Sequence, residues 1–241
     1  IGPFCVVGSE VTLHKGVNLI SHVSISGLTE IGDETKIWPF TSIGHEPQDL
    51  KYRGERTSLV IGKRNKIREG VSINTGTNGG GGITTIGDDC LFMLGSHVGH
   101  DCSIGNNVIV ANHGAIAGHV VIGDNVTIGG LSGIHQFCRI GEGAMIGAVS
   151  MVASDVIPFC TVLGERATLA GLNLVGLKRR GVSSKTIKEV RGAYEFLFAE
   201  DNSLRSQAEL ILSEQPKNEL VRIISDFILS ETNRSFLTPK I

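Results

Sequence analysis

An aliphatic residue recurs at every sixth position over most of this chain. The repeat runs from Ile1 to Ile43, returns in phase at Ile61, and continues from Ile86 to Val152. A small or β-branched residue occupies the position four residues after many of these aliphatic residues. Side chains alternate faces along a strand, so both repeating positions face one interior. Three such strands make one triangular coil, and stacked coils bond as parallel sheets. We therefore predict a left-handed parallel β-helix of hexapeptide repeats.

Two segments interrupt the repeat. Residues 44–60, GHEPQDLKYRGERTSLV, replace two hexads without disturbing the phase, and their charged, proline-containing composition predicts an extruded loop. Residues 76–82, GTNGGGG, add one residue to the count and are expected to be flexible. Loops carried on a rigid scaffold often hold functional residues.

The hexapeptide pattern ends after Pro158, and a helical pattern follows it. Ser183 and Ser184 are candidate caps for one helix, a second should start near Ser203, and a third at Pro216. We expect a β-helix over residues 1–164 and a small α-helical domain over 165–241 that caps the open end of the solenoid. Because the repeat is already in phase at Ile1, we also expect that coils preceding it are missing.

Composition excludes some partners. The formal net charge is −2, so no global field favours nucleic acid. No apolar run approaches the roughly 18 residues of a membrane-spanning helix, so we expect no integral membrane segment. The sequence contains no CxxC pair, and four of the five cysteines fall in the small inward position: Cys5, Cys90, Cys102 and Cys138. Reduced thiols of this kind are typical of a cytoplasmic protein.

The histidines behave differently from the core residues. His97 and His100 lie in the stretch GSHVGHDCSIG and miss the inward positions, as do the other six. His119 lies one coil of three hexads after Asp101, so the two should stack. These residues form an outward patch, which would lie in a cleft if one wall of the solenoid packed against symmetry mates. A solvated surface cluster is the simpler alternative.

Two chemistries could use such a patch. Three histidines from neighbouring subunits could bind zinc with an open fourth position, as in the hexapeptide-repeat carbonic anhydrases. Alternatively, one histidine could act as a general base for acyl transfer to a hydroxyl group. The spacing of the histidines leaves both alternatives open.

Several motifs resemble one family closely. QDLKY at 48–52, GSHVGHDCSIGN at 95–106, AGHV at 117–120, IHQFC at 134–138 and GLNLVGLKRRG at 171–181 are similar to those of the UDP-N-acetylglucosamine O-acyltransferases that open lipid A biosynthesis. The resemblance covers nearly the whole chain. It implies a homotrimer with active sites between subunits. It also implies transfer of a (3R)-3-hydroxyacyl chain from acyl carrier protein to the 3-position of UDP-N-acetylglucosamine. No metal or cofactor is implied beyond the phosphopantetheine of the carrier protein.

The resemblance also implies roles for individual residues. His100 would be the general base, Asp101 would hold its imidazole in the productive tautomer, and the Gly118 N–H would stabilise the developing oxyanion. Residues implied in substrate binding are Asp49 and Lys51 (sugar and nearby phosphate), His97 and His119 (cleft walls), His135 and Gln136 (nucleotide and acyl chain), and Asn173, Arg179 and Arg180 (uridine and diphosphate). Lys178, Arg179 and Arg180 could instead meet the acidic carrier protein.

Three positions depart from the family pattern. Asn74 stands where the family often has histidine, Val175 where it has glutamate, and Ala148 where glycine is common at the end of the acyl groove. We expect Asn74 to contact substrate and Ala148 to act as an acyl-chain ruler. Some members form an amide with the 3-amino analogue of the sugar, which is therefore an alternative acceptor. A CoA-dependent acetyltransferase on the same solenoid is a less favoured alternative.

Overall fold

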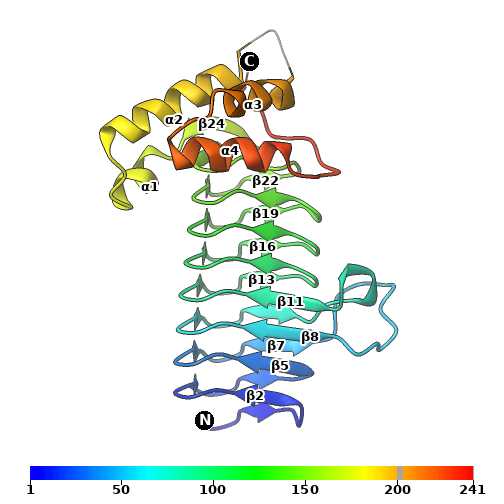
Figure 1. The fold of residues 1–241 in the computed structure, drawn as a ribbon. Coiled ribbons are helices and arrows are strands. Elements are labelled where there is room, and N and C mark those ends of the chain that lie inside the picture. Colours follow the sequence, from blue (N-terminus) through cyan, green and yellow to red (C-terminus); the bar gives the residue numbers. More distant parts are fainter. Residues whose placement is uncertain (200–202, 241) are drawn as a thin grey trace.

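The computed structural model describes residues 1–199 and 203–240. Its coils stack from the N-terminus to the helices at the opposite end, and two adjoining loops project from one side (Figure 1). The strands form three sheets that are parallel throughout the solenoid. The fold is the predicted left-handed parallel β-helix with a small helical region at its C-terminal end.

Each sheet receives one strand from each coil. The first sheet, called sheet A here, contains β1 (Val6–Val7), β4 (Ser24–Ile25), β7 (Ser42–His45), β10 (Ser72–Asn74), β13 (His97–Val98), β16 (Ala115–Ile116), β19 (Gly133–Ile134) and β22 (Met151–Val152). Sheet B contains β2 (Val11–Leu13), β5 (Leu28–Ile31), β8 (Ser58–Ile61), β11 (Ile83–Ile86), β14 (Ser103–Ile104), β17 (Val121–Ile122) and β20 (Arg139–Ile140). Sheet C contains β3 (Asn18–Leu19), β6 (Lys36–Ile37), β9 (Lys66–Ile67), β12 (Leu91–Phe92), β15 (Ile109–Val110), β18 (Thr127–Ile128), β21 (Met145–Ile146), β23 (Cys160–Leu163) and β24 (Thr168–Leu172).

The periodic aliphatic residues stack in register inside the prism. In sheet A, Ile43 pairs with Ile25 on one side and Ile73 on the other, and all three are at most 1% exposed. Burying such a side chain contributes roughly 1.5–3 kcal/mol. Because every coil adds three of these residues, the interior is a continuous aliphatic column.

The small inward position is also buried. Cys90, Cys102 and Cys138 are at most 1% exposed. Burial raises the pKa of the Cys90 and Cys138 thiols to about 11 and that of Cys102 to about 12. These residues therefore act as small core side chains.

Both interruptions of the repeat lie on the same side of the solenoid (Figure 1). The first loop is shorter than expected, because β7 extends to His45 and β8 begins at Ser58, which leaves residues 46–57 as the loop. The second contains a 3₁₀ turn, η1 (Asn78–Gly80). The two are joined by backbone hydrogen bonds, including one of 2.9 Å from Ser58 N to Gly82 O.

Among the described residues, four helices follow the solenoid: α1 (Leu174–Arg179), α2 (Ser184–Leu197), α3 (Leu204–Ser213) and α4 (Glu219–Leu229). Ser183 and Ser203 cap α2 and α3 as predicted, since each side chain accepts from a backbone N–H of the first turn. The third predicted helix begins later than expected, because Asn218 and not Pro216 supplies the cap. The short helix α1 was not predicted.

The C-terminal segment packs back against the end of the solenoid. β24 runs antiparallel to β23, and Asp155 and Leu169 form isolated bridges with Phe236 and Pro239. The expected boundary between the β-helix and the helical domain, at residues 164 and 165, falls in the turn before β24 and stays a prediction. Residues 200–202 and 241 of the expected helical domain lie outside the described residues. Within the described ranges, no helix is both long and apolar enough to cross a membrane.

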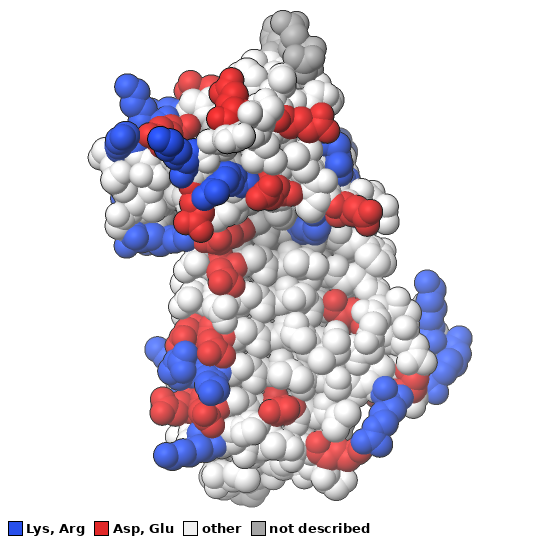
Figure 2. Space-filling model, viewed as in Figure 1, with Lys and Arg blue, Asp and Glu red and all other residues white. Residues whose placement is uncertain are grey.

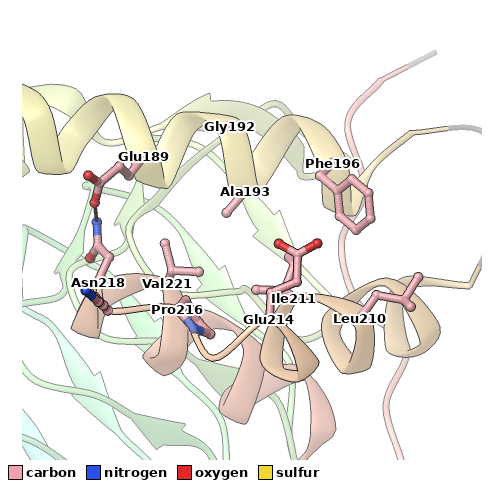
Figure 3. A pocket seen from close by; sticks show the side chains of 11 residues that line it. Glu189, Gly192, Ala193, Phe196, Leu210, Ile211, Glu214, Pro216, Asn218 and Val221 are labelled. Carbon is pink, nitrogen blue, oxygen red and sulfur yellow. Dashed lines mark hydrogen bonds between the residues drawn. The ribbon is translucent and has the colours of Figure 1, made fainter.

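A pocket lies between α2 and the α3–α4 segment (Figure 3), and none of its lining residues belongs to the histidine patch. Ala193, Ile211 and Val221 are among its apolar lining residues. At one end, Asn218 Nδ2 donates to Glu189 Oε2 over 2.9 Å. This contact ties the start of α4 to α2.

Candidate active site

The candidate site forms at the corners where sheet A passes into sheet B. His100 and Asp101 lie between β13 and β14, and the next two coils place His119 and Phe137 above them. Asp101, His119 and Phe137 have φ angles of 57°, 62° and 64°, so this left-handed corner conformation repeats from coil to coil. The rings of His119 and Phe137 stack with centroids 4.3 Å apart. The predicted stacking of Asp101 and His119 is confirmed.

His100 and Asp101 form a partly buried hydrogen-bonded pair. His100 Nδ1 donates to Asp101 Oδ2 over 2.7 Å, and the Asp101 side chain is 0% exposed. A carboxylate can only accept here, so the imidazole proton is held on Nδ1 and the Nε2 lone pair is left to accept a proton. This arrangement suits a general base.

Gly118 provides the space for the His100 imidazole. A Cβ at position 118 would lie 2.5 Å from His100 Cε1 and 2.6 Å from Nε2. Any side chain at position 118 would therefore displace the ring. The Gly118 N–H has no hydrogen-bond acceptor among the described residues, so it is available to a bound group.

His97 and His119 lie in desolvated surroundings beside this pair. His97 Nδ1 is hydrogen-bonded to Ser72 Oγ at 2.8 Å, and burial is the main cause that lowers the pKa of His97. Burial also lowers the pKa of His119, partly opposed by the charge of Asp101. A lowered pKa favours the neutral imidazole.

We predict that acid destabilises the protein partly through His97. Burial lowers its pKa in the folded chain, so below the ordinary value of 6.5 the unfolded chain binds more protons. The free energy of unfolding should fall as pH decreases from 6.5 through the folded pKa. His97→Gln should reduce this fall, because the variant lacks the group whose proton binding differs between the two states. Urea unfolding of the wild type and of His97→Gln at pH 7.5 and 5.5 measures the fall in the free energy of unfolding. An equal fall in both proteins would contradict the role given to His97.

A shallow groove along sheet A joins many of the predicted residues. It is lined by Gln48, Asn74, His97, Gly99, His100, Ala115, Ile116, Ala117, Gly118, Gly133, Ile134, His135, Gln136 and Met151. Small residues, Ala115 and Gly133, lie outward on its floor. Met151 Sδ lies over Gly133, only 3.0 Å from where a Cβ would be. The structure thus brings His97, His100, Gly118, His135 and Gln136 together, with Asn74 beside them.

Asn74 contacts the first loop as well as the groove. It is 6% exposed, and its Nδ2 donates to His45 O over 3.3 Å and Glu46 O over 2.9 Å. Its Oδ1 is buried and has no partner among the described residues. The side chain therefore anchors the start of the loop and presents an unused acceptor.

A second hollow has His119 and Phe137 in its wall. It is lined by Asp49, Lys51, Tyr52, Arg53, Gly54, Glu55, Thr77, Asn78, Gly79, His119 and Phe137. The Lys51 N–H donates to Asp49 Oδ1 over 3.0 Å. The predicted residues Asp49 and Lys51 therefore lie near the histidine patch, although loop 46–57 is far from it in sequence.

Apart from Asp101, which lies behind His100, four predicted residues lie outside both hollows. Asn173 caps α1 and its Nδ2 donates to Gly143 O over 3.0 Å, while Arg180 pairs with Glu142. These contacts lie at the corner between sheets B and C, a different edge of the prism from His100. Arg179 and Ala148 are exposed and line neither groove.

Three residues of the site were not predicted from the sequence. Phe137 stacks on His119, and the common corner position would have identified it. Arg234, from the C-terminal segment, lies 3.0 Å from His135 Nδ1 and donates to Gln136 O over 2.7 Å. Thr77 donates to Asp101 from both its amide and its hydroxyl. No local pattern identifies the last two.

The zinc alternative requires three histidines that converge from neighbouring subunits, whereas the described residues of this one chain bring together two histidines and an aspartate. Among the described residues, the one group with metal-ligand spacing is His100, Asp101 and His119, with candidate atoms within 4.8 Å of one another. The His100 Nδ1 proton points to Asp101 Oδ2, so that nitrogen is occupied. The expectation that no metal is required stays a prediction.

Two family models match consecutive parts of this chain. The family model "Udp N-acetylglucosamine O-acyltransferase; Domain 2" matches residues 155–237, and the model "Bacterial transferase hexapeptide (six repeats)" matches residues 83–118 and 119–154.

Individual proteins are similar to this chain over most of its length. An acyl-[acyl-carrier-protein]–UDP-N-acetylglucosamine O-acyltransferase of Paracoccus denitrificans is 59% identical over 84% of this chain and 77% of its own length. One of the same name from Rhizobium johnstonii is 45% identical over 98% of this chain and 87% of its own. A crystal structure of a UDP-N-acetylglucosamine acyltransferase matches with a TM-score of 0.96 and 46% identity, covering 100% of this chain and 92% of that chain. On this evidence, the chain belongs to the UDP-N-acetylglucosamine O-acyltransferase family.

Proposed function

We propose that this protein transfers a (3R)-3-hydroxyacyl chain from acyl carrier protein to the 3-hydroxyl of UDP-N-acetylglucosamine, the first step of lipid A biosynthesis. The observation that carries the proposal is the His100–Asp101 pair, with Nε2 free to accept a proton, at the end of a groove floored by small residues. The names of the relatives, which specify the same donor carrier and acceptor, support it.

In the proposed mechanism, His100 Nε2 takes the proton of the sugar 3-hydroxyl as its oxygen attacks the thioester carbonyl. Asp101 stabilises the imidazolium that forms. The Gly118 N–H donates to the oxyanion of the tetrahedral intermediate. When the C–S bond breaks, the imidazolium returns the proton to the departing phosphopantetheine thiolate. The products are the sugar ester and the free thiol of the carrier protein.

We propose that substrate groups occupy the two hollows on either side of the histidines. Asp49 and Lys51 would contact the sugar and its neighbouring phosphate, and His97, His119 and Asn74 would line the acceptor site. His135 and Gln136 would meet the nucleotide and acyl chain. The acyl chain would follow the outward row Ala115–Gly133 of sheet A, where small side chains leave space. Ala148 remains the proposed ruler at the end of this path.

We propose a homotrimer in which sheet A faces a neighbouring subunit. The outward column of sheet A has no Lys, Arg, Asp or Glu: Val6, Ser24, Ser42, Ser72, His97, Ala115, Gly133 and Met151. The matching columns of the other sheets include charges, such as Glu30 in sheet B and Lys66 in sheet C. A second subunit is also required to bring Asn173, Arg179 and Arg180 to the histidines, because these residues lie along another edge of their own subunit.

Light scattering should therefore give a mass three times the 25.6 kDa of one chain. Ser42→Arg should reduce the mass to that of a monomer, because an arginine buried in this uncharged face would be desolvated without a partner. Thr127→Arg, at the matching outward position of sheet C, is the control and should remain trimeric. A monomeric wild-type protein would rule out the arrangement.

We propose that the acidic carrier protein docks near α1 and α2. Exposed cations at this end include Lys178, Arg179, Lys185, Lys188 and Arg191, and Figure 2 shows blue side chains gathered there. Opposite charges accelerate the encounter of the two proteins and make its rate sensitive to salt.

We also propose that the reaction takes place in the cytoplasm. The five cysteines are free thiols, which fit a reducing compartment.

The direct test supplies the protein with 3-hydroxyacyl carrier protein and UDP-N-acetylglucosamine. Mass spectrometry should show an alkali-labile ester of the nucleotide sugar and an equal amount of free-thiol carrier protein. Acetyl-CoA is the control donor and should give little product. Faster transfer from acetyl-CoA would contradict the proposal.

A further inference from the structure

The glycine-rich segment 76–82, which has no part in the proposed mechanism, closes over the Asp101 carboxylate. It enters after β10 and leaves into β11, with the 3₁₀ turn η1 at its centre. Thr77 is 5% exposed, and Gly80 N and Gly82 N donate to its carbonyl over 3.0 and 2.8 Å. The segment is therefore folded around Thr77.

Thr77 binds both oxygens of Asp101. Its amide N–H donates to Oδ1 over 2.7 Å, and its Oγ1–H donates to Oδ2 over 2.7 Å. Oδ2 also accepts from His100 Nδ1, so one oxygen serves the threonine and the base together. The Nδ1 atom of His119, the other titratable side chain facing this carboxylate, lies 3.7 Å from the same oxygen. On the backbone side, Asp101 N donates to Thr84 Oγ1 over 2.8 Å. These contacts leave the carboxylate a single orientation.

The glycines explain how the segment comes so close. A Cβ at Gly80 would lie no more than 2.5 Å from Cγ and both oxygens of Asp101, and a Cβ at Gly76 would lie 2.8 Å from Oδ1. Only glycine permits the backbone to cover the carboxylate at these two positions. The glycines at positions 76 and 80 are therefore what allows the segment to contact the Asp101 carboxylate.

We propose that Thr77 is a positioning residue for the acyl transfer, acting on His100 through Asp101. This inference rests on the proposed roles of those two residues. The threonine prevents the carboxylate from rotating away from Nδ1. Its hydroxyl also takes up part of the acceptor capacity of Oδ2, which moderates how strongly the carboxylate stabilises the imidazolium. The first effect keeps Nε2 aimed at the substrate, and the second keeps the base effective at lower pH.

The test compares Thr77→Val, which removes only the hydroxyl donor, with Thr77→Ser, which retains it. Thr77→Val should lower kcat about tenfold, the scale of one hydrogen bond, with KM for both substrates within about twofold. The acid limb of its kcat/KM profile should move to higher pH by about half a unit, because the unrestrained carboxylate then favours the imidazolium more. Thr77→Ser should restore kcat to within about twofold and return the limb to the wild-type pH.

Thr75→Val is the matched control. It removes another buried hydroxyl of the same stretch, one that bonds Thr57 Oγ1 at 3.1 Å and not Asp101. It should leave the pH profile in place. An unchanged profile in Thr77→Val, or a loss that Thr77→Ser does not restore, would overturn the inference.

A double-mutant cycle separates this inference from the proposed site. In an Asp101→Asn background, Thr77→Val should have little further effect on kcat, because its target is already altered. Independent, multiplicative losses would overturn the role of Thr77 while leaving Asp101 in place. Full activity of Asp101→Asn alone would overturn the proposed role of Asp101, and the inference with it.

Discussion

His100→Ala should lower kcat by roughly 10²–10⁴-fold while the protein stays folded and trimeric, because a sugar hydroxyl is a weak nucleophile without a base. The imidazole lies outside the aliphatic column, against Gly118 and Asp101, so its loss removes no core packing. Single-turnover assays give the rate, and thermal unfolding with light scattering tests the structure. His14→Ala, at an exposed histidine bonded to Glu30, is the control and should remain active.

Two companion variants identify the base. Asp101→Asn should cost less than His100→Ala, because it disturbs the orientation of the imidazole without removing it. His97→Ala should weaken binding or turnover only modestly, since its ring is tied to Ser72 beside the cleft. If His97→Ala were inactive and His100→Ala nearly as active as the wild type, the base would be His97 and not His100.

Gly118→Ala should lower kcat by about 10²-fold. The added methyl would lie 2.5 Å from His100 Cε1, so the imidazole must move, and displacement of a catalytic group by about an ångström costs this much. The main-chain N–H proposed to bind the oxyanion remains in the variant. The loss should therefore appear in kcat, with substrate binding largely retained.

The clash at position 118 involves the His100 ring alone among the nearest atoms. Gly118→Ala should consequently have little further effect in a His100→Ala background, and this double variant is its internal control. An equal loss in both backgrounds would show that the glycine acts on the backbone and not on the base.

The fold was predictable because its contacts repeat at short range. Each coil bonds only to its neighbours, so Ile25, Ile43 and Ile73, whose separations are multiples of six residues, follow one another in space as they do in sequence. The same logic predicted that His119 stacks over Asp101. Sequence patterns did not predict the start of α4 correctly, because Asn218 and not Pro216 caps that helix. They also did not predict α1, because its six residues are too few to show a helical period.

The candidate site was only partly predictable, because some of its contacts depend on how loops and ends fold back. Thr77 reaches Asp101 only because an added segment closes across the corner, and Arg234 reaches His135 from 99 residues away. Asn173 and Arg180, grouped with the site by their motif, lie along another edge and are engaged with Gly143 and Glu142. Hexapeptide spacing specifies which residues face inward and which coils are neighbours. The closure of a loop over a carboxylate depends on contacts between distant segments, which have no period in the sequence.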